Sequence, residues 1–222
     1  MNLSTLQLMR LVSPALPIGS FAYSQGMEYA VESGWVDDES SASAWISGLL
    51  HFSIGTLDLP LLVRMHGAWC RGDAADVHRL SAWLLANRET RELRAEDRMV
   101  GGALARLLAG LGNARAQQLQ ERGDLTLAAT FSLAAVSWNI GAEDAAAGYL
   151  WAWLENQSAA AIKLVPLGQT SAQRIIDEQL GTAVHLVERS MDMEWKDVGG
   201  SLPGVALASA LHETQYSRLF RS

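Results

Sequence analysis

The sequence has little of what several classes of protein need. It holds one cysteine, Cys70, among 222 residues, so no disulfide can form within the chain and a reducing cytoplasm is expected. Lysine occurs only at Lys163 and Lys196, and the formal net charge is −7, which argues against nucleic acid as a partner. Prolines number five and 49% of the residues are apolar, so the chain is not a disordered tail. We therefore predict one soluble cytoplasmic domain over residues 1–222.

The chain also lacks a long uninterrupted apolar stretch. Its first residues show no basic region followed by an apolar run, so we predict no secretion signal. The best membrane-span candidate is the uncharged stretch 125–142, which hydroxyl residues, Asn139 and Gly141 interrupt. We expect a buried helix of a soluble bundle there, and no membrane as a partner.

Helical periodicity dominates what the sequence does have. Apolar residues recur three or four positions apart in many segments, and strand-like alternation is scarce. Gly101 and Gly102 are expected to loosen one long helix. The pattern predicts an all-α fold, a single-domain bundle of about eight to ten helices. The expected helices cover residues 3–12, 27–33, 37–52, 60–69, 73–86, 88–111, 125–140, 145–165, 171–189 and 205–212.

Motifs of catalysis and cofactor binding are scarce as well. No Gly-x-Ser-x-Gly elbow occurs, and "GGALARLLAGLG" lies within a helical pattern and lacks Gly-Lys-Ser/Thr. No histidine lies within four positions of another, so we predict no metal and no cofactor. One alternative is a metal site with His66 and Cys70 on one helical face and Asp73 beyond Gly72. A buried thiol on an apolar helix is the favoured interpretation.

The segment "RETRELRAEDR", residues 88–98, separates its charges by sign. Like charges three or four positions apart destabilise an isolated helix. We therefore expect opposite charges from another helix or another chain, and the alternative is a solvated charged helix. On a helical wheel one side carries Arg88, Arg91, Arg94 and Arg98, and the other carries Glu89, Glu92, Glu96 and Asp97.

Two further segments place unusual residues near the end of the chain. Lys163 is the single charge in "SAAAIKLVPLGQ" and either extends to the surface or marks a polar contact at an interface. The C-terminal "HETQYSRLFRS" places Tyr216, Leu219 and Phe220 where chain ends usually fray. As a helix this segment would have an apolar edge. Packing onto its own domain and folding against a partner both remain open.

The loop "SPALPIGSFAYSQG", residues 13–26, contains two aromatic side chains. Its prolines, Gly19 and serines have structural roles as a helix stop, a turn and N-caps. Phe21 and Tyr23 have no such role. Because they lie beside a rigid turn and look exposed, we interpret them as a docking surface.

Five segments, taken together, resemble the UreF family of urease accessory proteins. They are "LPIGSFAYSQGMEYAVESGWV", "DLPLLVR", "ETRELRAEDR", "KLVPLGQTSAQ" and "HETQYSRLFRS", which follow one another in the family's order over nearly the whole chain. The resemblance implies an all-α fold, a tendency to form a homodimer, and a non-enzymatic role as a cytoplasmic chaperone component in nickel insertion. It also implies three partners: UreD (UreH in some organisms), the GTPase UreG and urease apoprotein.

The resemblance also assigns roles to residues of this chain. It implies that Lys163 lies near the partner-facing surface that influences the GTPase, and that UreD or a second copy covers Phe21 and Tyr23. An alternative function is a GTPase-activating protein for UreG that uses an arginine of the 88–98 helix, with Arg91 and Arg94 as candidates. Within 205–222, the residues expected to order against UreD are Tyr216, Arg218, Leu219, Phe220 and Arg221.

Overall fold

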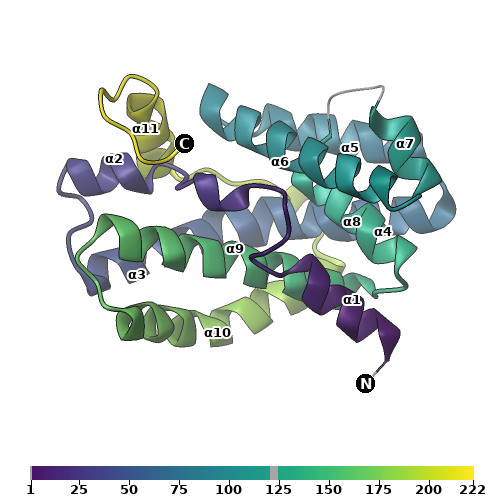
Figure 1. Ribbon diagram of the computed structural model, residues 1–222, viewed down its shortest axis with the longest axis horizontal. Helices are drawn as coiled ribbons and strands as arrows, with labels where there is room; N and C mark the ends of the chain where they lie inside the picture. The colour runs from purple at the N-terminus through teal and green to yellow at the C-terminus, as the bar shows by residue number, and fades with distance from the viewer. Residues whose placement is uncertain (1, 121–124) are drawn as a thin grey trace.

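The computed structural model describes residues 2–120 and 125–222, and over these residues the fold is all-α (Figure 1). This confirms the predicted all-α bundle; the homodimer stays a prediction. The α-helices are α1 (Leu3–Leu11), α2 (Met27–Glu32), α3 (Glu39–Leu49), α4 (Leu59–Arg71), α5 (Ala74–Ala86), α6 (Arg91–Gly110), α7 (Ala114–Gln120), α8 (Leu127–Ser137), α9 (Ala142–Leu164), α10 (Gln169–Asp192) and α11 (Pro203–His212). Between them lie 3₁₀ turns η1 (Ser20–Ala22) and η3 (Trp195–Asp197) and the π-helical segment η2 (Leu50–Asp58).

The long helices surround a core built mainly from α4, α8 and α9. Helix α4 packs on α8, α5 and α9, while α10 lies along α9 and α6 lies along α8. The short helices α2 and α11 contact each other at one end of the bundle, where the chain also ends (Figure 1). This end brings residues from the beginning, middle and end of the chain together.

Helices α3 and α4 are parts of one continuous helix rather than two. The sequence predicted a break between residues 52 and 60, but η2 joins the two helices without interruption. Leu59 N–H bonds the carbonyl five residues back, at Ile54, and Pro60 follows in the first turn of α4. Pro60 has no N–H to donate to the preceding turn, and the carbonyl of Thr56 in that turn accepts Gly199 N–H at 2.8 Å instead. The start of the continuous helix, at α3, was predicted correctly, since Asp38 and Ser41 form a capping box there.

The continuous helix over Glu39–Arg71 is the one helix in the described parts of the chain that could cross a membrane by length and composition. Sixty-one per cent of its apolar window is buried inside the fold, as in core helices of soluble proteins. The uncharged stretch 125–142 does not form a helix long enough to cross a membrane. Its helix α8 has 11 residues and is almost wholly buried, as the sequence predicted.

Helix α6 begins later than predicted and is not loosened by its glycines. Thr90 caps it by accepting a hydrogen bond from Leu93 N–H at 3.2 Å, which leaves Arg88 outside the helix. Gly101 instead permits close packing, because a Cβ there would lie 2.5 Å from the carbonyl oxygen of Leu125. The expectation of a weakened helix at Gly101 was therefore wrong.

The predicted helix over 205–212 is confirmed as α11, but the residues after it are not helical. From Glu213 the chain turns back toward α2 and ends beside η1 (Figure 1). We call residues 213–222 the C-terminal tail. Phe220 is 6% exposed and Ser222 is buried, so the tail packs on its own domain in this structure.

Candidate functional site

The C-terminal tail is attached to the bundle through its own backbone. The Glu28 carboxylate of α2 accepts the N–H groups of Leu219 at 2.5 Å and Phe220 at 2.8 Å. Arg221 N–H donates to the carbonyl of Ala22 at 2.8 Å. These acceptors satisfy backbone donors that a helix would have satisfied internally, so the irregular tail does not leave these N–H groups unpaired.

A buried histidine joins the tail to two helices. His212, the last residue of α11, is 0% exposed and lies between two carboxylates. Its Nε2 lies 3.1 Å from Glu28 Oε2 and its Nδ1 lies 2.7 Å from Glu92 Oε2. The other oxygen of Glu92 accepts a hydrogen bond from Arg218 Nη1 at 2.9 Å. We call Glu28, Glu92 and His212 the tail clasp.

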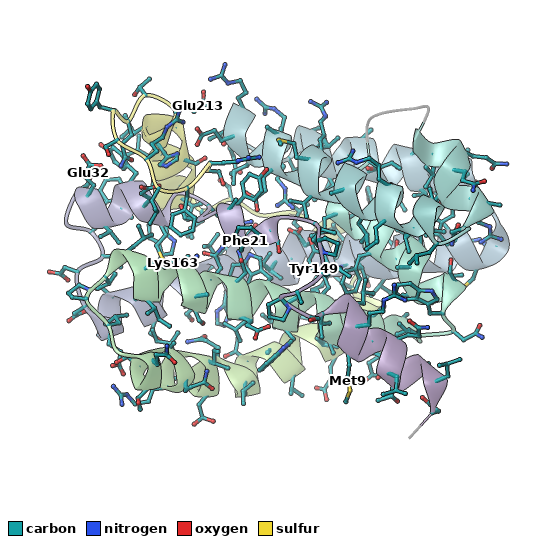
Figure 2. The ribbon with its side chains drawn as sticks, viewed as in Figure 1. Met9, Phe21, Glu32, Tyr149, Lys163 and Glu213 are labelled. Carbon is teal, nitrogen blue, oxygen red and sulfur yellow. The ribbon has the colours of Figure 1, made fainter. Side chains whose placement is uncertain are left out.

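The outer face of the tail is apolar and aromatic. Tyr216 is fully exposed, Leu219 is 67% exposed and Phe21 of η1 is 64% exposed. The ring of Phe220 in the tail is buried, and the Nζ of Lys163, which Figure 2 labels, lies 5.5 Å from its centroid. The exposed Lys163 therefore makes a cation–π contact with the tail. We call Phe21, Lys163, Tyr216 and Leu219 the tail surface.

Tyr23 does not belong to this surface. Its side chain is 4% exposed and its hydroxyl donates to Met99 Sδ at 3.5 Å. Burial raises the pKa of Tyr23, while a hydrogen bond with Arg221 opposes that shift. The expectation that Tyr23 is exposed was wrong. Side chains two positions apart can lie on opposite sides of a turn, and only Phe21 points outward.

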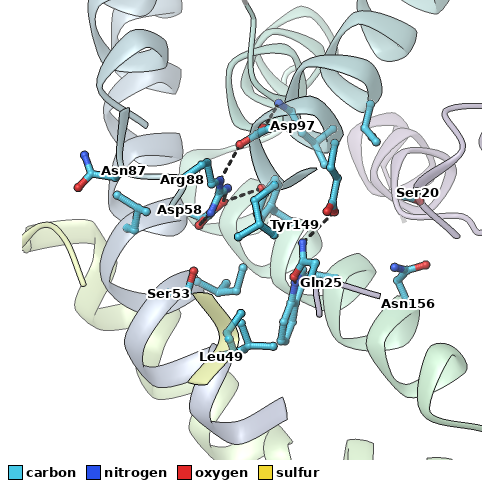
Figure 3. Close-up of a pocket in the computed structure, with 18 of the residues that line it drawn as sticks. Ser20, Gln25, Leu49, Ser53, Asp58, Asn87, Arg88, Asp97, Tyr149 and Asn156 are labelled. Carbon is cyan, nitrogen blue, oxygen red and sulfur yellow. Dashed lines mark hydrogen bonds and ion pairs between the residues drawn. The ribbon is translucent and has the colours of Figure 1, made fainter. Parts of the chain in front are cut away.

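A second group of charges is buried in the middle of the bundle (Figure 3). Arg88 Nη2 lies 2.5 Å from Asp58 Oδ1, and its Nε lies 2.9 Å from Asp97 Oδ2. Tyr149 donates its hydroxyl to Asp58 Oδ1 at 3.0 Å. Burial opposes the charge on Arg88, but the carboxylates of Asp58 and Asp97 outweigh it and raise its pKa well above the usual value. The expected opposite charge from elsewhere in the chain therefore exists for Arg88, and it comes from η2.

A cavity of about 100 Å³ lies beside the buried charges (Figure 3). Glu96 lines it and accepts hydrogen bonds from Gln25 Nε2 at 2.8 Å and from Ser222 Oγ at 3.0 Å. Trp153 donates to the same glutamine at 2.8 Å. Burial raises the pKa of Glu96 to about 7.

The two arginines considered for action on a nucleotide have different environments. The side chain of Arg91 is 80% exposed and lies 3.4 Å from Glu213 Oε2. Arg94 is half-buried and donates to the carbonyl of Arg88 at 2.6 Å. Arg91 is therefore available to another molecule, whereas Arg94 supports the loop before α6.

The alternative metal site is not supported by its geometry. His66 Nε2 faces the carbonyl of Ile140 at 2.9 Å, and its Nδ1 lies 3.8 Å from Cys70 Sγ. Within residues 2–120 and 125–222, no group of three or more histidine, cysteine or carboxylate side chains could hold a metal ion. His66 thus serves as a contact between α4 and the loop after α8. The interpretation of Cys70 as a buried thiol was wrong, because Cys70 is exposed near the end of α4.

Comparison with known proteins identifies the family. The family model for UreF matches residues 36–179. The chain is 50% identical to the urease accessory protein UreF of Alkalilimnicola ehrlichii over 221 residues, which cover 100% of this chain and 97% of the relative. The chain belongs to the UreF family of urease accessory proteins.

Two more relatives extend the match over both chains. The UreF of Chromohalobacter salexigens is 50% identical and covers 97% of this chain and 93% of its own length. The UreF of Hahella chejuensis is 47% identical and covers 99% of both chains. The five segments singled out in the sequence therefore belong to a UreF fold, and the structure brings the first, third and last of them together at the tail.

Several residues of this UreF site were missed by sequence reasoning. Neither the clasp nor the buried acceptors of Arg88 were predicted. The sequence could have indicated that Asp58 has a buried partner, because it is the only charge in the apolar stretch "SIGTLDLPLL". Lys163 is likewise the only charge in its apolar run. For the clasp no local signal exists, because its members come from three distant segments.

Proposed function

We propose that this chain is a non-enzymatic urease maturation factor that acts in the cytoplasm as a scaffold. In this role it binds UreD (UreH in some organisms) and recruits or regulates the GTPase UreG, so that nickel enters the metallocentre of urease apoprotein. Membership of the UreF family supports urease maturation as the process. A homodimer of this chain is part of the proposal.

The single observation that carries the scaffold role is the tail surface. Tyr216 and Leu219 are exposed although Glu28 of α2 holds the backbone N–H groups of Leu219 and Phe220. Exposed aromatic and apolar side chains on a fixed support are typical of protein–protein hot spots. A partner can bind such anchor side chains without a large loss of conformational entropy, because their support is already ordered.

The test is retention of UreD by the purified full chain. We expect the double variant Tyr216→Ala, Leu219→Ala to lose UreD while remaining folded by circular dichroism. The matched control is Val184→Ala, which removes an apolar side chain that is 60% exposed on α10, away from the tail. Full retention of UreD by the double variant would contradict the assignment of the tail surface.

A GTPase-activating role for UreG is the second candidate, and the exposure of Arg91 favours it over Arg94. An exposed guanidinium can reach a nucleotide held by another protein, as arginine fingers do. Arg94 does not meet this requirement, because its guanidinium is engaged with the backbone of Arg88.

A further inference from the structure

We propose that the exposed face of α6 docks an acidic helix of a protein partner. This face carries three arginines, with small residues between them. We call Arg91, Ala95, Arg98, Gly102 and Arg106 the basic face. The inference deepens the proposed function, on which it rests for the identity of the partner, because it names the chemistry of one partner contact. The basic face itself is a property of the isolated chain.

The first argument is what the fold does with the charges that the sequence separates by sign. All three carboxylates of α6 are bonded to groups within the fold. Glu92 and Asp97 are buried, and Glu96 is half-buried. Arg98 and Arg106, in contrast, are exposed. Because the acids turn inward, α6 has a positively charged outer face in a chain whose formal net charge is −7.

The second argument is the spacing of the arginines. Arg91, Arg98 and Arg106 follow one another at intervals of two helical turns, about 10–12 Å along the axis of α6. The basic face spans about 80° of the helix surface, so its side chains point the same way. A facing helix presents carboxylates at the same intervals, as charged residues beside coiled-coil seams do. Ala95 and Gly102 leave room for its backbone between the guanidinium groups.

The third argument is where the basic face lies. Helix α6 runs along one edge of the bundle, and its inner side packs on α7 and α8 (Figure 1). At the first turn of α6, Glu213 Oε2 lies 3.4 Å from Arg91 Nη2, so a carboxylate of this chain already pairs with the face. Arg98 and Arg106 continue the face beyond that contact. They are the positions that a partner's carboxylates would reach.

The charge of the rest of the chain favours a protein helix over a nucleic acid or an anionic membrane. The formal net charge is −7, and lysine occurs only at Lys163 and Lys196. An extended polyanion on the basic face would also approach the negatively charged remainder of the surface, which repels it. An acidic helix about 10 Å wide covers only the strip that carries the arginines.

The first experiment uses the isolated full chain and a synthetic probe. The probe is a helical peptide of three heptads with glutamate along one face, and its control carries glutamine at the same positions. In ¹⁵N spectra at low salt, we expect the glutamate peptide to shift the amide resonances of Ala95, Arg98 and Gly102. We expect the glutamine peptide to leave them unchanged. Shifts confined to other elements, or equal shifts with both peptides, would overturn the proposal.

The second experiment compares two double variants that change the net charge equally. Arg98→Gln, Arg106→Gln removes two guanidinium groups from the basic face. The control, Arg71→Gln, Arg189→Gln, removes two exposed ones near the ends of α4 and α10. We expect the first variant to bind the glutamate peptide at least about fivefold more weakly than the wild type, and the control to bind it within about twofold of the wild type. Equal weakening in the two variants would overturn the proposal, because net charge alone would then explain it.

The same variants show which partner supplies the acidic helix. Purified UreD, UreG and urease apoprotein are each titrated with the full chain. We expect one of them to bind Arg98→Gln, Arg106→Gln at least about tenfold more weakly than it binds the control variant. Unchanged binding of all three would overturn the docking role. Failure of the wild type to bind any of them would contradict the proposed function alone, since the peptide measurements need no partner.

Two further measurements test other occupants of the basic face. Sedimentation equilibrium of the chain alone should give the same oligomeric state for the wild type and for Arg98→Gln, Arg106→Gln. A difference would show that a second copy covers the face and would overturn the proposal. Neither protein should sediment with vesicles of phosphatidylserine and phosphatidylcholine, and vesicle binding that only the wild type shows would overturn a protein helix as the occupant.

Discussion

Arg88 and Asp58 form a two-pronged ion pair inside the bundle, although 30 positions separate them in the sequence. Two guanidinium nitrogens of Arg88 contact the two carboxylate oxygens of Asp58, at 3.1 Å and 2.5 Å. The carboxylate is completely buried. The pair fixes the loop before α6 against η2, and both residues line the central cavity.

Removal of one partner from this pair should be strongly destabilising. Asp58→Asn leaves the Arg88 charge with only Asp97 as a buried counter-ion, so we expect the free energy of unfolding to fall by about 3–5 kcal/mol. Urea denaturation measures the change. The control is Glu39→Gln, which breaks an exposed ion pair with Arg174 and should lower the free energy of unfolding far less. Equal effects of the two variants would contradict a structural role for the buried pair.

Glu96 should make stability fall as the pH rises. Burial raises its pKa in the folded protein from 4.5 to about 7, so the folded state favours the protonated carboxyl. The resulting stabilisation is complete below pH 4.5 and is lost as the pH rises to 7. For this partly buried group we expect a loss of about 2 kcal/mol. Urea denaturation across this range should show the decline in the wild type and a smaller one in Glu96→Gln; identical profiles would contradict the assignment.

Two adjacent glycines of α6 should respond oppositely to alanine. Gly101→Ala places a methyl group against the backbone at Leu125 and Thr126, so we expect a loss of about 2 kcal/mol or more in unfolding free energy. Gly102→Ala meets only the end of the Arg106 side chain and should gain up to about 1 kcal/mol from helix propensity. Thermal unfolding of both variants tests the packing, and a neutral Gly101→Ala would show that α6 and α8 can separate.

Loss of the Arg94 side chain should lower the stability of the fold, whereas loss of the Arg91 side chain should affect a partner's activity. Arg94→Ala removes a hydrogen bond to the backbone of Arg88 and should cost about 1–2 kcal/mol of stability, whereas Arg91→Ala should cost less than about 0.5 kcal/mol. If the chain activates UreG through Arg91, then Arg91→Ala lowers GTP hydrolysis in the complete assembly about a thousandfold or more. Unchanged GTP hydrolysis with Arg91→Ala would contradict the GTPase-activating role, and only the scaffold role would remain.

Much of the fold could be predicted because it follows from local signals. Apolar periodicity located most of the helices but missed α7 (Ala114–Gln120), and Asp38 was correctly placed at the start of one of them. The break expected before Pro60 was wrong, since a π-helical turn allows the chain to pass the proline within one helix. The start of α6 was also misplaced, because the Thr90 cap outweighed the helical pattern that continues back to Arg88.

The candidate site was predictable only in part. Its outward members, Phe21, Tyr216 and Leu219, were identified because exposed apolar residues in polar segments are visible in sequence. Tyr23 and Phe220 were chosen by the same reasoning, yet their side chains are buried. Exposure of a side chain in a loop depends on what the rest of the chain brings against it, and periodicity carries no such information.

The sequence by itself determined that this protein is a helical bundle with a single cysteine, a net negative charge and the ordered segments of UreF, because these are properties of composition and local spacing. Only the tertiary structure decided which charges meet. Asp58 pairs with Arg88, and His212 lies between Glu28 and Glu92, because helices distant in sequence pack together and exclude water from these groups. Burial then requires each charge to find its opposite, and in doing so it fixes the shape of the tail.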